Sequence, residues 1–265
     1  MKIARYPGLT EWPGEVIQTS GRLAGICDGT FDITCAPLTS LWRYYSGIPE
    51  IPPEEEIDKS IALVDYRSLE IDSESHTGRL SRIGQAVDLG GVGKGYTADV
   101  VAWIYKGLGV ESAYINMGGN VMVLGNKPDG GCWLIGIQHP RGRRGVPVCV
   151  LPVSNKSVVT SGDYEKCFSL NGRMYHHILD PQTGYPTDSG LVSTTVVCDC
   201  STTADIFSTA TFVLGLEKGM DLIGGMTDVE AVFIDKNKRI YITEGLRDCL
   251  GLTEEADGYS CFVYK

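Results

Sequence analysis

The sequence predicts an α+β fold with mostly antiparallel sheets and flanking helices. Segments with strand character outnumber helical ones, and most of them follow one another directly along the chain. A doubly wound parallel fold would instead alternate strand and helix. The chain has 265 residues, of which 43% are hydrophobic and 21% are charged, which is ordinary for one domain or for two intimate lobes. We therefore expect residues 1–265 to form a single domain.

Four segments are predicted to be helices. Residues 52–64, PPEEEIDKSIALV, carry the clearest signals, because prolines open the segment, acids fill its first turn and apolar residues recur along one face. Residues 15–27 end before a turn, and residues 97–109 begin at a threonine and end in glycines. Residues 202–215 form the fourth predicted helix.

Short apolar and β-branched runs bounded by turn residues predict the strands. Residues 230–244 hold two such runs around a polar turn, which is typical of a hairpin. The other strands are predicted at residues 112–117, 120–125, 133–138, 148–153, 157–162, 174–179 and 191–200.

The chain is acidic, with a formal net charge of −10 and a pI near 4.9. This balance argues against nucleic acid as a bulk partner, because phosphate binding needs a basic face. A bound cation can still bring a single phosphate ligand to an acidic protein. No apolar stretch approaches the roughly 18 residues of a membrane span, and the first residues lack the apolar core of a signal peptide. As written, the sequence predicts a cytoplasmic protein or one that has been trimmed.

Nine cysteines are present, and no two of them are separated by two residues. Cys198 and Cys200 alternate within a strand-like run, which would place both on one face of a sheet. A zinc site or a redox pair would be compatible with that spacing, but buried structural thiols are the simpler interpretation.

The run GGVGKG at residues 90–95 looks like a nucleotide-binding loop but fails both known patterns. A P-loop would need a glycine where Asp88 stands and a hydroxyl where Gly95 stands, and a dinucleotide fingerprint would need a glycine in place of Tyr96. The stretch still joins a carboxylate, a flexible turn, a lysine and a predicted helix start. Another role must account for it.

The segment TTADIFSTA places oxygen-bearing side chains on one face of a predicted helix. Asp205 and Thr209 are separated by four residues, and Ser208 lies beside them at a spacing of three. A carboxylate with hydroxyls is a hard oxygen set that suits Mg²⁺ or Ca²⁺. The alternative is structural, with an aspartate that caps the helix and hydroxyls that bond back to the backbone.

The segment HHILDPQTGYP combines two histidines with a turn. His176 and His177 should point to opposite faces of a strand, so only one of them can face a given pocket. The run from Asp180 through Pro181 to Gly184 is a turn signature that would fix the end of this strand. A histidine near an aspartate could act as a general base, although a structural role is the alternative.

Three further stretches bring glycines or polar residues to strand ends and turns. In NMGGNV, Gly118 and Gly119 end a strand where the backbone can approach a flat or charged ligand. VVTSGDYE offers Ser161 and Gly162 in the same way, and DGTFDITCAP places acidic and aromatic residues in a turn. A tight turn would explain each stretch alone.

Taken in order, these stretches resemble one family. DGTFDITCAPLTSLW, DLGGVGKGYTAD, NMGGNV, SGDYEK, HHILDPQTGYP and TADIFSTA are similar to the successive motifs of the ApbE-type FAD:protein FMN transferases, from about residue 15 to residue 247. The resemblance implies an ApbE-like fold and an enzyme that cleaves the FAD pyrophosphate. It implies that FMN is joined through a phosphoester to a threonine of an acceptor protein, a flavinylated redox subunit, and that AMP is released.

The resemblance also implies roles for individual residues. Mg²⁺ would be held by Asp205 and Thr209 with Ser208 close by, and by a backbone carbonyl at Gly91. His177 matches the candidate base, and Asp180 would orient it or steady the turn. The residues expected at the flavin nucleotide are Thr30, Phe31, Asp32, Asp88, Lys94, Gly118, Gly119, Ser161, Gly162 and Leu179.

The sequence departs from the family at its N-terminus. Family members usually begin with an export signal, often with a lipid-attachment cysteine, and with a first strand that adds flavin contacts. Only 27 residues precede Asp28 here. We therefore keep two alternatives, an FAD pyrophosphatase that gives FMN and AMP, and an FAD-binding protein without turnover.

Overall fold

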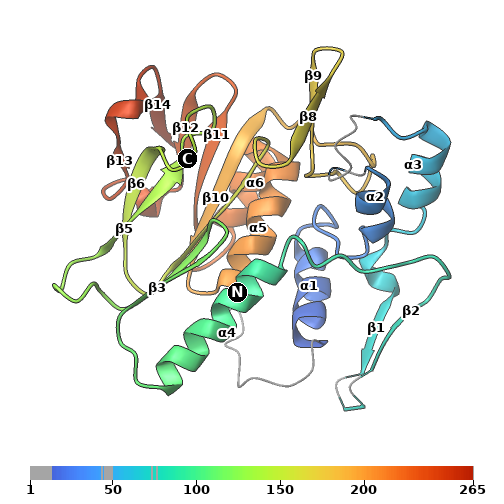
Figure 1. Cartoon of the computed structure of the whole chain (residues 1–265), viewed down its shortest axis with the longest axis horizontal. Helices are drawn as coiled ribbons and strands as arrows, with labels where there is room; N and C mark the ends of the chain where they lie inside the picture. Colours follow the sequence, from blue (N-terminus) through green and yellow to red (C-terminus); the bar gives the residue numbers. More distant parts are fainter. Residues whose placement is uncertain (1–13, 43, 45–49, 73, 76, 265) are drawn as a thin grey trace.

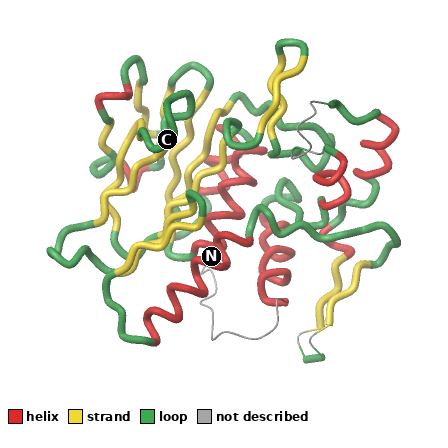
Figure 2. Tube along the Cα trace, viewed as in Figure 1, coloured by secondary structure: helices red, strands yellow, loops and turns green. Residues whose placement is uncertain are grey.

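A computed structural model of the chain describes residues 14–42, 44, 50–72, 74, 75 and 77–264. Its centre is a seven-stranded sheet in the order β14-β12-β11-β10-β7-β4-β3 (Figures 1 and 2). Neighbouring strands are antiparallel except for the parallel pair β12 and β14. The strands are β3 (Ala113–Met117), β4 (Asn120–Leu124), β7 (Ser157–Gly162), β10 (Leu191–Cys198), β11 (Glu230–Asp235), β12 (Arg239–Ile242) and β14 (Ser260–Val263).

Helices cover one face of this sheet. Helix α5 (Ser201–Leu214) packs on β7 and β10, and α1 (Gly14–Ile26), α4 (Gly93–Gly107) and α6 (Leu216–Gly224) pack around it. The other face is covered by the three-stranded sheet β13-β6-β5 (Figure 1). Its strands are β5 (Trp133–Gln138), β6 (Pro147–Val153) and β13 (Gly251–Leu252).

The central strands are buried on both faces, and their side chains alternate between two cores. On β10, Val196 packs with the helices and Val197 packs with the small sheet, and both are at most 4% exposed. On β11, Phe233 packs with the helices and Val232 packs with the small sheet. Because consecutive strand residues point to opposite faces, a continuous apolar run fits a strand enclosed by two layers.

A smaller core lies beside the central sheet, under α2 (Ala36–Leu41) and α3 (Glu54–Ile61). Trp42 is 2% exposed there and its indole nitrogen donates a hydrogen bond to the Gly184 carbonyl at 2.8 Å. This contact ties the N-terminal lobe, which contains α1, α2 and α3, to the turn after the two histidines. The remaining elements are β1 (Leu69–Asp72), β2 (Thr77–Leu80), β8 (Cys167–Leu170), β9 (Arg173–His176), and the short helices η1 (Tyr66–Ser68), η2 (Glu244–Leu246) and η3 (Glu254–Ala256).

The predicted α+β class with mostly antiparallel sheets is confirmed, and two local predictions need correction. The helix expected over 97–109 begins at Gly93. The strand expected over 174–179 ends at His176, because Ile178 and Leu179 leave the ladder for the turn that follows. None of the helices in the described residues is long and apolar enough to span a membrane.

The prediction that Cys198 and Cys200 lie on one face of a sheet is wrong. Strand β10 ends at Cys198, and Cys200 precedes α5, where its thiol donates to Asp99 at 3.3 Å. Burial raises the pKa of Cys198 to about 12. Since its thiol stays protonated, Cys198 behaves as a buried structural residue.

Candidate active site

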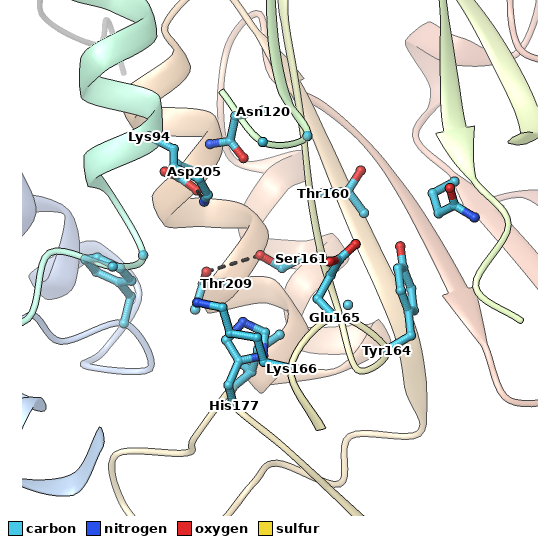
Figure 3. A pocket seen from close by; sticks show the side chains of 18 of the residues that line it. Lys94, Asn120, Thr160, Ser161, Tyr164, Glu165, Lys166, His177, Asp205 and Thr209 are labelled. Carbon is cyan, nitrogen blue, oxygen red and sulfur yellow. Dashed lines mark hydrogen bonds and ion pairs between the residues drawn. The ribbon is translucent and has the colours of Figure 1, made fainter. Parts of the chain in front are cut away.

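A pocket of about 1080 Å³ opens between the N-terminal lobe and the small sheet. Its base is formed by β7 and α5, where Ser161 contacts Thr209 and Asp205 lies one helical turn from Thr209, beside Lys94 (Figure 3). The sequence-predicted residues that line it are Thr30, Phe31, Asp32, Asp88, Gly91, Lys94, Gly118, Gly119, Ser161, Gly162, His177, Leu179, Asp205 and Thr209.

Three side-chain oxygens gather at the base of the pocket. Asp205 and Thr209 lie one turn apart on α5, and Thr209 Oγ1 is 3.2 Å from Ser161 Oγ on β7. The Asp205 side chain is 3% exposed, and its carboxylate accepts hydrogen bonds from Lys94 Nζ at 3.2 Å and from Gly95 N at 2.9 Å. A buried carboxylate thus faces the pocket beside two hydroxyls and one cation.

Two predicted site residues lie outside the pocket lining. Ser208 is fully buried, and its hydroxyl donates to the Asp205 carbonyl at 2.9 Å and lies 2.8 Å from Ser161 Oγ. Ser208 lies on the side of α5 that faces the sheet, and its hydroxyl contacts Ser161 on the side away from the pocket. The Asp180 carboxylate accepts a hydrogen bond from Gln182 N at 2.9 Å, which steadies the turn.

The oxygen set fits a hard divalent cation. Asp205, Thr209 and Ser161 supply one carboxylate and two hydroxyls, and Gly91 lies beside them, since a Cβ built on it would be 3.8 Å from Thr209 Oγ1. In the described part of the chain no three His, Cys, Asp or Glu side chains form a metal-binding group. A cation here would therefore depend on hydroxyls, a backbone carbonyl and oxygens of the substrate, which are ligands that Mg²⁺ accepts.

The last glycine of GGVGKG, Gly95, allows two helices to pack closely. A Cβ on Gly95 would be 2.3 Å from the Ser201 carbonyl oxygen and 2.8 Å from Asp205 Cβ. Only a glycine lets α4 approach α5 this closely, and the approach brings Gly95 N to the Asp205 carboxylate. Asp99 on α4 adds a second link, because it accepts hydrogen bonds from Ser201 N at 2.8 Å and Thr202 N at 2.7 Å. The run thus positions Asp205 and Lys94.

We expect Gly95→Ala to destabilise the protein by about 3 kcal/mol or more, because the added carbon collides with backbone rather than with a mobile side chain. Gly93→Ala is the matched control, since a Cβ there meets nothing within 4 Å, and alanine favours the helix by up to about 1 kcal/mol. Chemical denaturation of both variants measures the difference. Equal stability of the two variants would contradict the packing role assigned to Gly95.

The adjacent histidines have different surroundings. His176 is 6% exposed, lies 3.0 Å through Nε2 from the Thr187 carbonyl and packs edge-on against Phe212. His177 lines the pocket, and its Nδ1 is buried without a hydrogen-bond partner among the described residues. Burial first, and then the nearby cation of Lys166, lowers the pKa of His177 to about 4. His177 is therefore a neutral imidazole at physiological pH, with a ring nitrogen free to bind a proton.

Two predicted nucleotide contacts already have internal partners. Asp32 accepts hydrogen bonds from Thr34 N at 2.7 Å and Tyr66 N at 2.8 Å, and burial raises its pKa. Asp88 accepts from Gly90 N and Thr39 Oγ1, both at 2.7 Å. These carboxylates hold the loops that form one wall of the pocket.

The sequence interpretation missed several residues of the pocket. Asn120 is 2% exposed, lines the pocket, and has a side-chain nitrogen without a partner among the described residues (Figure 3). Asn120 belongs to the motif NMGGNV, but only the two glycines of this motif were predicted from the sequence as site residues. Within SGDYEK, Ser161 and Gly162 were selected, whereas the last three residues of the motif also line the pocket. The missed lining residues include Asn120, Gln138, Arg144, Tyr164, Glu165 and Lys166.

Solved structures of ApbE proteins share this fold. The ApbE protein of Thermotoga maritima is 29% identical, with a TM-score of 0.82, over 91% of this chain and 78% of that chain. The Vibrio cholerae flavin transferase ApbE is 28% identical, with a TM-score of 0.78, over 91% of this chain and 77% of that chain. The sequence profile of the ApbE family matches residues 10–233. The chain belongs to the ApbE family, as the six motifs predicted.

Curated relatives agree with this assignment. The FAD:protein FMN transferase of Klebsiella pneumoniae is 35% identical over 244 residues, which cover 92% of this chain and 75% of the relative. The enzyme of that name from Treponema pallidum is 32% identical over 233 residues, which cover 83% of this chain and 64% of the relative. The chain thus matches between about two thirds and three quarters of these relatives' lengths.

Proposed function

We propose that this chain transfers FMN from FAD to a threonine hydroxyl of an acceptor protein, with Mg²⁺ as cofactor and AMP as the second product. The names of the relatives support flavin transfer from FAD to a protein. The observation that carries the proposal is the meeting of a buried Asp205, the hydroxyls of Thr209 and Ser161, and a neutral His177 in one pocket.

The proposed chemistry is a displacement at phosphorus. The acceptor oxygen forms a bond to the FMN phosphorus of FAD, the bond from that phosphorus to the bridging oxygen breaks, and AMP leaves with the electron pair. When bound, the cation would neutralise pyrophosphate oxygens and the charge that develops on AMP. Asp205, Thr209 and Ser161, with the Gly91 carbonyl, are the groups that would hold it.

The remaining roles belong to residues of this chain. His177 takes the proton of the acceptor hydroxyl, and its low pKa keeps it in the base form. Lys94 contributes a positive charge beside the phosphates, although it shares that charge with Asp205 at 3.2 Å. The Asn120 side-chain nitrogen is a donor without a protein partner among the described residues, and we assign it to a phosphate or ribose oxygen.

The test is an incubation of the protein with FAD, Mg²⁺ and a threonine-bearing acceptor domain. We expect mass spectrometry to show an acceptor heavier by one FMN, with one AMP released for each transfer and no reaction in EDTA. AMP with free FMN and an unlabelled acceptor would instead identify an FAD pyrophosphatase. Bound but uncleaved FAD would identify a binding protein without turnover.

A further inference from the structure

Two strand edges border the pocket, one from the central sheet and one from the small sheet. Among the described strands, β3 pairs only with β4, and β5 pairs only with β6. Tyr114 on β3 is 48% exposed, Leu134 on β5 is 67% exposed, and both line the pocket. Free strand edges beside exposed apolar side chains are suited to bind an extended polypeptide.

The chain segment 130–162, which contains β5 and β6, is basic although the chain as a whole is acidic. Residues 130–162 contain four lysines and arginines and no aspartate or glutamate, whereas the whole chain has a net charge of −10. Three of the four lie in the loop between β5 and β6, at Arg141, Arg143 and Arg144. Arg143 is exposed and has no ion pair among the described residues. Arg144 lines the pocket with a side chain that is 83% exposed and lies 3.8 Å from Glu165, a contact that stabilises little.

Arg141 fixes this loop to the strand that bears Ser161. Its guanidinium donates to both oxygens of Asp163, at 2.6 and 2.7 Å. Asp163 is 2% exposed and stands two residues after Ser161. A planar two-bond contact with a buried carboxylate sets the orientation as well as the distance. A ligand bound to this loop is therefore held at a fixed position relative to Ser161 at the base of the pocket.

The pocket extends to two sides of the Ser161–Thr209 pair (Figure 3). In Figure 3, Thr160, Tyr164 and Glu165 lie to one side of the Ser161–Thr209 pair, and Lys94 with Asp205 lies to the other. The N-terminal lobe and the small sheet also lie on opposite sides of α5 in Figure 1. The side next to the small sheet therefore lies apart from Lys94 and Asp205, where the proposed function places the FAD phosphates (Figures 1 and 3).

We infer that Tyr114, Leu134 and Arg144, which line the pocket, form an acceptor rim together with the neighbouring exposed Arg143, and that this rim binds the acceptor protein as an extended, acidic segment. This inference rests on the proposed function and adds the chemistry of its second substrate. The strand edges recognise extended backbone, and the arginines recognise carboxylates next to the acceptor threonine. A carboxylate of the segment would replace Glu165 as the partner of Arg144.

The test measures binding of short synthetic peptides to the FAD-loaded protein by anisotropy of a red dye. Three peptides share a central threonine and carry acidic, neutral or lysine flanks. We expect the acidic peptide to bind about tenfold more tightly than the neutral one. The net negative charge of the whole protein would by itself favour the opposite order. We expect Arg144→Glu, which changes the arginine that lines the pocket, to remove this preference and to bind the lysine peptide more tightly than the wild type does.

Lys156→Glu is the matched control, since Lys156 lies in the same acid-free stretch but outside the pocket lining, where it pairs with Asp199 at 2.7 Å. It should leave the acidic preference in place. Equal binding of the three peptides, or the same loss in Lys156→Glu, would overturn the acceptor rim. Because binding is measured without turnover, failure of the rim is distinguishable from failure of FMN transfer.

Discussion

Asp205→Ala is expected to reduce FMN transfer by about 10³-fold or more, because it removes a group that stabilises charge on the reacting phosphates. Asp205 is the carboxylate that α5 presents at the base of the pocket, and the hydroxyls beside it carry no charge. Its loss also leaves Lys94 without its ion pair. AMP release and acceptor labelling, both followed against Mg²⁺ concentration, measure the effect.

Asp205 has a structural role as well, and Asp205→Asn separates the two. The carboxylate accepts a hydrogen bond from Gly95 N at 2.9 Å, which links α5 to the start of α4. An amide oxygen can keep this bond, whereas alanine loses it at a cost of about 1 kcal/mol. We expect the asparagine variant to be nearly as stable as the wild type and still to lose most transfer. Transfer by this variant at the wild-type rate and Mg²⁺ dependence would exclude Asp205 as the metal ligand.

Features encoded in local periodicity were predictable from the sequence. Short apolar and β-branched runs predicted most of the strands, including β5 of the small sheet and β7 of the central sheet with their observed bounds. Helical spacing placed Asp205 and Thr209 on one face of α5, and both line the pocket. The adjacent histidines were expected to face opposite ways, and one packs against Phe212 while the other lines the pocket.

Contacts between distant segments were not predictable in this way. Ser161 and Thr209 are 48 residues apart, and Arg141 contacts Asp163 from the loop between β5 and β6. The close approach at Gly95 depends on Ser201, which no local pattern relates to residues 90–95. Ser208 was grouped with the metal ligands because it lies beside Asp205 on the helix, but only the packing of α5 on β7 shows that it faces Ser161.

His177→Gln is expected to reduce FMN transfer by about 10²–10⁴-fold while FAD still binds. Glutamine preserves much of the volume and a hydrogen-bonding group, but it cannot take a proton from the acceptor hydroxyl. His176→Gln serves as the comparison, because His176 is buried against Phe212 and bonds Thr187 rather than lining the pocket. A loss confined to FAD affinity in His177→Gln would contradict its role as base.

The pKa of His177 predicts the pH dependence of both activity and stability. Burial holds it at about 4, below the usual 6.5, so kcat/KM should stay high as the pH falls through 6.5 and should decline only toward about 4. The unfolded imidazole binds its proton near pH 6.5, so the folded state loses stability as the pH falls from 6.5 toward 4. Above 6.5 both states are neutral and His177 contributes no slope. The contribution of His177 is the difference in the free energy of unfolding between the wild type and His177→Gln, measured by denaturation at each pH. A difference that does not change between pH 6.5 and pH 4 would show that His177 titrates normally in the folded protein.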